Sequence, residues 1–79
     1  MADVILSDGR EINFDLSRIT IREYRRLFDR EQSEDEEFAT LAKAAGISKE
    51  DVANLSYTDW RRFGQAFFVK AREPLADPN

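Results

Sequence analysis

The sequence contains neither cysteine nor histidine. Without cysteine there are no disulfides and no thiolate metal sites, and the redox compartment stays unspecified. Without histidine the chain lacks the commonest general base and the commonest zinc ligand. Its three glycines are isolated from one another, so they form no loop that cradles a phosphate. We therefore expect a protein that is not an enzyme and that holds no metal or cofactor.

Long apolar runs and an excess of positive charge are also missing. No apolar stretch approaches the roughly 20 residues that cross a bilayer. The start, Met1-Ala2-Asp3, has neither the basic residues nor the apolar stretch of a signal peptide. Twelve lysines and arginines face sixteen acids, giving a net charge of -4, which is the wrong sign for a non-specific nucleic-acid binder. We expect a cytoplasmic protein with no membrane or nucleic-acid partner.

What the chain does contain is enough apolar sequence for one small domain. Hydrophobic residues make up 42% of 79 residues, too many for a wholly disordered chain. Pro74 is expected to stop the last helix. We therefore predict a single domain over residues 1–73 and a frayed tail over residues 74–79.

Residues 4–14 have the pattern of a β-hairpin, in which short β-prone runs flank Asp8-Gly9. A three-residue loop with a left-handed Gly9 would place Val4 opposite Ile12. That register puts four apolar side chains on one face, whereas a two-residue turn would not. They are Val4, Leu6, Ile12 and Phe14. A lone hairpin is marginally stable in water, so this face is expected to pack on helices.

Four helices are predicted from their capping residues. The caps and their box partners are Thr20 with Glu23, Ser33 with Glu36, Ser48 with Asp51, and Ser56 with Asp59. The apolar stripe of the first helix is Ile21, Tyr24, Leu27 and Phe28, and that of the second is Phe38, Leu41, Ala42 and Ala45, with Gly46 as the C-terminal cap. The prediction is an α+β fold, mainly α: an N-terminal β-hairpin packed on a bundle of about four short helices.

Two charged regions have ordinary structural explanations. The acidic run over residues 31–37 lacks the alternating acids and central glycine of a calcium loop, and it suits the first turn of a helix. The arginines of the first helix and Arg61-Arg62 could form a basic patch, pair with the acidic run, or lie over the core. We favour the last two explanations.

Residues 41–55 have the pattern of a DNA-binding helix-turn-helix, with Gly46 in the turn. The surface of the second helix argues against that function. It offers Lys49, Glu50, Asp51 and Asn54 but no arginine, and acids near phosphates are repelled. An ordinary corner in a helical bundle explains the pattern, and a helix-turn-helix DNA-binding regulator remains the alternative.

The fourth predicted helix carries more aromatic residues than one small core readily covers. Trp60, Phe63 and Phe67 follow helical spacing and are expected in the core. The addition of Tyr57, Phe68 and Val69 indicates a surface that binds a partner, and burial of all these side chains is the alternative. The candidate partner-binding residues are Tyr57, Trp60, Phe67 and Phe68, with Arg61 and Arg62 at the rim.

Three segments together resemble phage tail assembly chaperones, which are small non-virion proteins of phages and prophages. They are residues 4–14 (VILSDGREINF), residues 19–27 (ITIREYRRL), and a third segment that runs from 41–51 (LAKAAGISKED) into 55–60 (LSYTDW), and they occur in the family's order. The resemblance implies a chaperone of the bacterial host cytoplasm that holds the tail tape measure protein soluble and helps recruit tail tube proteins. Some relatives self-associate, so it also allows a homo-oligomer. The expected mechanism is reversible burial of an amphipathic helix against an apolar groove.

Overall fold

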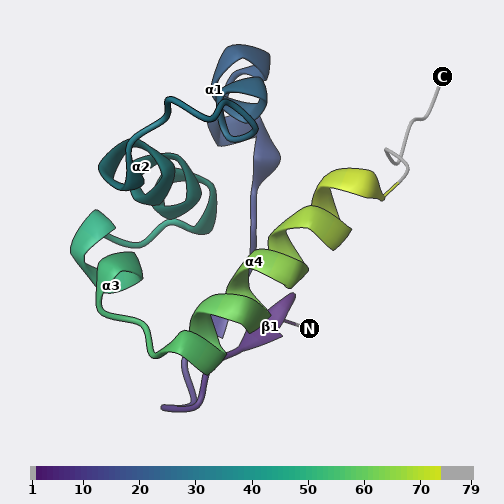
Figure 1. Ribbon diagram of the computed structural model, residues 1–79. Helices are drawn as coiled ribbons and strands as arrows, with labels where there is room; N and C mark the ends of the chain where they lie inside the picture. The colour runs from purple at the N-terminus through teal and green to yellow at the C-terminus, as the bar shows by residue number, and fades with distance from the viewer. Residues whose placement is uncertain (1, 74–79) are drawn as a thin grey trace, which may run out of the picture.

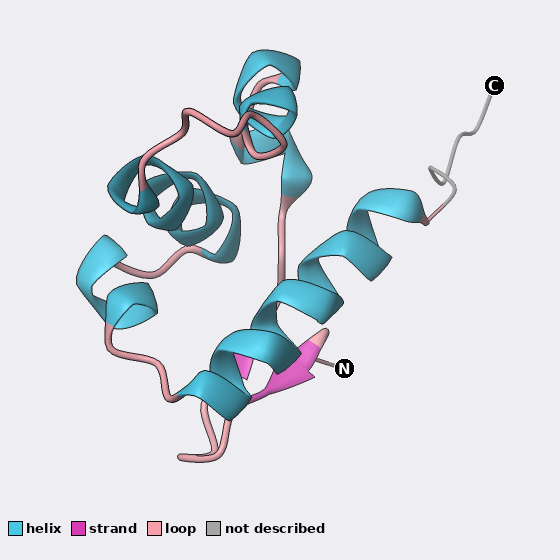
Figure 2. Ribbon diagram, viewed as in Figure 1, coloured by secondary structure: helices cyan, strands magenta, loops and turns pink. Residues whose placement is uncertain are grey.

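The computed structural model describes residues 2–73 and has the predicted α+β fold (Figures 1 and 2). Within that range, a two-stranded antiparallel hairpin precedes one short 3-10 helix and four α-helices. The elements are β1 (Val4–Ile5), β2 (Glu11–Ile12), η1 (Leu16–Arg18), α1 (Ile21–Arg26), α2 (Glu34–Ala45), α3 (Lys49–Ala53) and α4 (Tyr57–Arg72). The sequence did not predict η1. The prediction of a frayed tail concerns residues 74–79, which lie outside the described residues.

The hairpin has the predicted register. Val4 pairs with Ile12, and the Leu6 amide donates a hydrogen bond to the Arg10 carbonyl at 2.9 Å. Gly9 has a φ of 89°, the left-handed conformation that the three-residue loop needs and that a side chain would strain. Of the predicted apolar face, Leu6, Ile12 and Phe14 are buried and Val4 is half-buried. The choice of register from apolar alternation was therefore right.

The core lies between the hairpin, α2, α3 and α4, and α4 crosses the hairpin in Figure 1. Phe14 fits against two rings of α4, with centroids 5.0 Å from Phe63 and 5.5 Å from Phe67, both in edge-on geometry. Such pairs contribute roughly 0.5–1.5 kcal/mol beyond the area they bury. The buried apolar side chains are Leu6, Ile12, Phe14, Leu41, Ala42, Ala44, Ala45, Val52, Phe63 and Phe67.

The start of α4 is joined to the hairpin turn by a buried carboxylate. Ser56 caps α4 as predicted, because its hydroxyl accepts from the Asp59 amide at 3.2 Å. The Asp59 side chain was expected to complete a capping box, but it turns toward the hairpin instead. It accepts from the Ser7 amide at 3.1 Å and from the Ser7 hydroxyl at 2.7 Å. Tertiary contact thus replaces the local capping pattern.

α2 and α3 form the predicted corner. Gly46 has a φ of 73°, and its amide donates to the Ala42 carbonyl at 2.8 Å, as a left-handed C-terminal cap does. The Asp15 amide donates to the Ala44 carbonyl at 2.8 Å, so the segment before η1 covers the end of α2. Ala44 is fully buried, although it was not part of the predicted inner face of α2.

The prediction for α1 is only partly right. Its capping box between Thr20 and Glu23 forms, but the helix ends at Arg26 after six residues. Ile21 and Phe28 of the predicted stripe are 66% and 63% exposed. The reason is length, since so short a helix presents fewer than two turns to its neighbours. No residue of α1 is fully buried.

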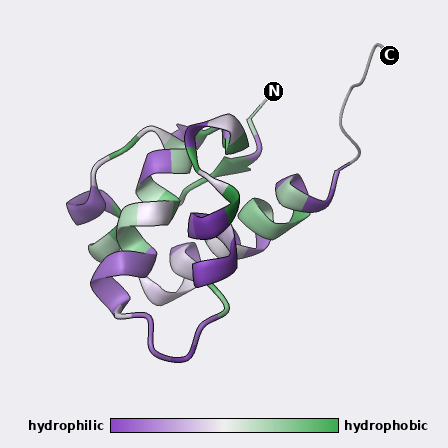
Figure 3. Cartoon of the chain, turned by 90° about the horizontal axis from the view of Figure 1, so that it is seen from above, coloured by the Kyte–Doolittle hydropathy of each residue, from purple (hydrophilic) through white to green (hydrophobic). Residues whose placement is uncertain are grey.

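The last turns of α4 extend away from α2 and α3 (Figure 1), and from above they project beyond the other elements (Figure 3). Several of the residues in this projecting half are hydrophobic (Figure 3). Among residues 2–73, no helix is both long and apolar enough to traverse a bilayer.

Candidate partner-binding surface

The structure places the six predicted binding residues in different environments along α4. Tyr57 is 74% exposed, and Arg61 and Arg62 are also exposed. Trp60 and Phe68 are half-buried, so each ring packs against the core and is also partly exposed to solvent. Phe67 is fully buried between Phe14 and its own helix neighbours. Phe67 is therefore a core residue, and its side chain exposes no surface in this structure.

Tyr57 and Trp60 line a recess of about 340 Å³ at the N-terminal end of α4. The Phe38 and Trp60 rings pack edge to face, with centroids 5.4 Å apart. Glu34 and Glu37 border this recess. Burial, with a smaller contribution from the charge of Glu34, raises the pKa of Glu37 above its ordinary value. This end of the surface is therefore aromatic and acidic.

Phe68 belongs to a second hollow, which we call the α4 outer groove. It has a volume of about 520 Å³ and is lined by Phe28, Gln65, Phe68, Val69 and Arg72. The Phe28 and Phe68 ring centroids lie 5.7 Å apart, so the second residue after α1 contacts α4. Phe28 and Val69 are 63% and 61% exposed. The groove thus has an apolar floor with a cation at one end.

The predicted aromatic residues at the surface therefore lie in two separate hollows. Eleven residues separate Tyr57 from Phe68, about 16 Å along a helix that rises 1.5 Å per residue. The predicted set omitted Phe28, because apolar spacing placed it in the core stripe of the first helix. The sequence feature that indicates an exposed Phe28 is the polar segment 29–33, which follows it directly.

The arginines of α4 are exposed, and the expectation that Arg61 and Arg62 pair with the acidic run or lie over the core was wrong within residues 2–73. Arg61, Arg62 and Arg72 form no ion pair with any residue from 2 to 73. By contrast, Lys70 lies 3.6 Å from an Asp3 oxygen and 3.7 Å from a Glu73 oxygen. The outer face of α4 is thus locally basic in an acidic protein.

Gly64 leaves a gap between the side chains on the outer face of α4. It lies one turn before Phe68 and one turn after Trp60, so it shares their side of the helix. A glycine inside a helix is about 1 kcal/mol less favourable than alanine. A Cβ atom at position 64 would have nothing within 4 Å, so packing within residues 2–73 does not require glycine here. The position leaves the backbone of α4 open to close approach.

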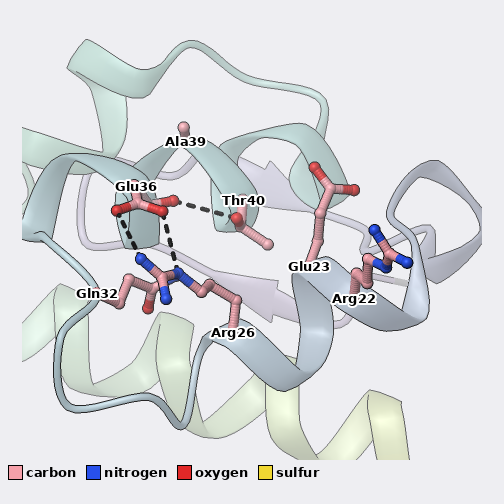
Figure 4. A pocket seen from close by; sticks show the side chains of 7 residues that line it. All are labelled: Arg22, Glu23, Arg26, Gln32, Glu36, Ala39 and Thr40. Carbon is pink, nitrogen blue, oxygen red and sulfur yellow. Dashed lines mark hydrogen bonds and ion pairs between the residues drawn. The ribbon is translucent and has the colours of Figure 1, made fainter.

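A third groove, of about 470 Å³, lies between α1 and α2 and is lined mainly by charged and polar side chains (Figure 4). The Arg26 guanidinium reaches Glu36 at 3.3 Å, and Lys43 reaches Glu23 at 2.7 Å. The hydrogen bond from Arg26 lowers the pKa of Glu36, and the hydrogen bond from Lys43 lowers the pKa of Glu23. The ion pairs tie α1 to α2, which matters because α1 has no buried residue of its own.

The α2–α3 corner has little positive charge to offer a nucleic acid. α3 spans only five residues, and Glu50 and Asp51 lie in its first turn. Its lysine, Lys49, is paired with Asp35 at 3.0 Å. In residues 2–73, no three side chains of the metal-binding types come together.

Comparison of the chain with protein-family models, with curated proteins and with solved structures finds no match.

Proposed function

We propose that this chain is a non-enzymatic binding protein that acts as a phage or prophage tail assembly chaperone. It would hold the tape measure protein soluble in the cytoplasm of the bacterial host and help recruit tail tube subunits. Catalysis, cofactors, nucleic acids and membranes have no part in this proposal. The step from a binding protein to a tail chaperone depends on the resemblance of the three sequence segments.

One observation carries the binding function: large apolar side chains remain exposed at both ends of α4. Tyr57 and Val69 on α4 and Phe28 beside it are each more than 60% exposed. Scattered exposed apolar residues are normal, but these line hollows that also contain half-buried Trp60 and Phe68. Burying them against a partner supplies roughly 25 cal/mol per Å² of apolar surface, without a chemical step.

The alternative, a helix-turn-helix DNA-binding regulator, is less well supported. A recognition helix needs several side chains directed at base edges and phosphates. α3 has five residues, and its single lysine is engaged by Asp35. Incubation with duplex DNA at low salt separates the two proposals. A salt-dependent mobility shift would favour the regulator and count against the chaperone.

The chaperone proposal is tested by co-expressing the chain with the tube and tape measure genes of its own genome. We expect affinity capture of the chain to recover one of these proteins in soluble form. The paired change Tyr57→Ser and Phe68→Ala should reduce that recovery. Ile5→Ala is the matched control, because Ile5 is also an exposed apolar residue but lies on the hairpin.

Two results would overturn the proposal. One is recovery of neither tail protein with the unaltered chain. The other is a genome that encodes neither protein.

A further inference from the structure

The α4 outer groove combines an apolar floor with positive charge that no acid among residues 2–73 neutralises. Phe28, Phe68 and Val69 supply the apolar surface, and Arg72 lies in the groove itself. Arg61 lies seven residues before Phe68, so it occupies the same face two turns earlier. Neither arginine pairs with an acid among residues 2–73, although the protein has more acids than bases. An apolar surface beside these arginines favours a ligand that is apolar on one side and carries acidic groups.

Gly64 favours a helix as the ligand, because a glycine lets a second helix approach α4 closely. Helices pack with their axes about 8–10 Å apart, and small residues at the contact bring them to the short end of that range. Gly64 provides such a position beside Phe68, with open space above it. A helix crossing α4 there would place apolar side chains on Phe68 and Val69.

We propose that the α4 outer groove binds an acidic amphipathic helix of a partner protein. The apolar stripe of that helix covers Phe28, Phe68 and Val69, its backbone approaches α4 at Gly64, and its flanking carboxylates meet Arg61 and Arg72. Apolar burial supplies most of the affinity, while the arginines select the charge of the partner. The identity of the protein that supplies the helix rests on the proposed function. The acidic and amphipathic character of the helix is inferred from the groove alone.

Two designed peptides test the charge preference directly. Each has about 21 residues with leucine at the a and d positions of three heptads. One carries glutamate at the flanking positions and the other carries lysine. We expect fluorescence anisotropy to show that the glutamate peptide binds about tenfold more tightly at low salt, and that added salt narrows the difference. The comparison is sharp because a net charge of -4 would by itself favour the lysine peptide.

Charge-reversal variants locate the site. Arg61→Glu with Arg72→Glu should weaken binding of the glutamate peptide by about tenfold or more. Arg22→Glu is the control for each of the two reversals made singly, because Arg22 lines the α1–α2 groove and has no ion pair within residues 2–73. That variant makes a charge change of the same sign elsewhere and should bind nearly as well as the unaltered protein.

Variants of Gly64 test the close approach. Gly64→Ala should weaken binding of the glutamate peptide by about threefold, and Gly64→Leu should weaken it further, because each adds atoms at the contact. The melting temperature should not fall in Gly64→Ala, because the added methyl group meets open space. Loss of affinity without loss of stability would assign the effect to the interface.

The inference is overturned if the lysine peptide binds as well as the glutamate peptide, or if Arg61→Glu with Arg72→Glu leaves affinity unchanged. Failure of the proposed function would look different. The glutamate peptide would then bind with the predicted pattern, while co-expression recovered no tail protein. A tail protein recovered equally well by the charge-reversed variant would leave the proposed function intact and refute this groove as its site.

Discussion

The contact between Asp59 and Ser7 makes the stability of this protein depend on one buried carboxylate. Asp59 accepts hydrogen bonds from the Ser7 amide and hydroxyl, at 3.1 Å and 2.7 Å. Hydrogen bonds to charged groups contribute roughly 1.5–3 kcal/mol, and the contribution is at the lower end here because water can reach Ser7. A negative charge in the first turn of a helix adds roughly 0.3–1 kcal/mol. We therefore expect Asp59→Ala to lower the free energy of unfolding by about 2–3 kcal/mol.

This loss is large for a domain of this size. At roughly 0.05–0.15 kcal/mol per residue, the whole protein has about 4–12 kcal/mol of stability. Urea unfolding followed by helical circular dichroism measures the change. With a slope of about 1 kcal/mol per M for a small domain, the urea midpoint should fall by about 2–3 M.

Asp51→Ala is the matched control for this prediction. Asp51 occupies the same position after the Ser48 cap of α3 as Asp59 does after the Ser56 cap of α4. Its carboxylate is exposed and pairs with Arg10 at 3.4 Å, so we expect a loss of about 0.5 kcal/mol. Ser7→Ala should cost about 1 kcal/mol, and its effect should largely disappear when Asp59 is already alanine. The reasoning is refuted if Asp59→Ala costs no more than Asp51→Ala.

Three further predictions concern charge and backbone conformation. The pKa values of Glu23 and Glu36 are lowered in the folded protein, so their ion pairs stabilise α1 above the ordinary value of 4.5 and this stability is lost as the pH falls below it; NMR shifts of α1 should move before those of α4, and simultaneous movement would contradict this order. The pKa of Glu37 is raised, so its carboxylate opposes folding at neutral pH, and Glu37→Gln should raise the melting temperature there; a lower one would count against it. Gly46→Ala should cost about 1–2 kcal/mol in urea unfolding, because φ is 73° and the new methyl group meets Arg18; an unchanged midpoint would disprove this strain.

Local patterns in the sequence determined most of the elements. The capping hydroxyls of Thr20, Ser33, Ser48 and Ser56 each accept the predicted amide, because a cap is decided within four residues of chain. The hairpin register followed from apolar alternation and Gly9, since a slip of one residue would have exposed the whole face. Both kinds of prediction depend on neighbours in the chain, which the sequence lists directly.

The binding surface depended on contacts that no local pattern contains. Phe67 and Phe68 are adjacent aromatic residues in the sequence, yet Phe67 is sealed against Phe14 and Phe68 faces a groove. Phe28 fitted an apolar stripe, but α1 ended before the stripe could be buried. The sequence by itself determined that α4 carries more aromatic residues than the core can take. Only the tertiary structure decided which of them stay at the surface, because burial is set by what packs against each side chain from distant parts of the chain.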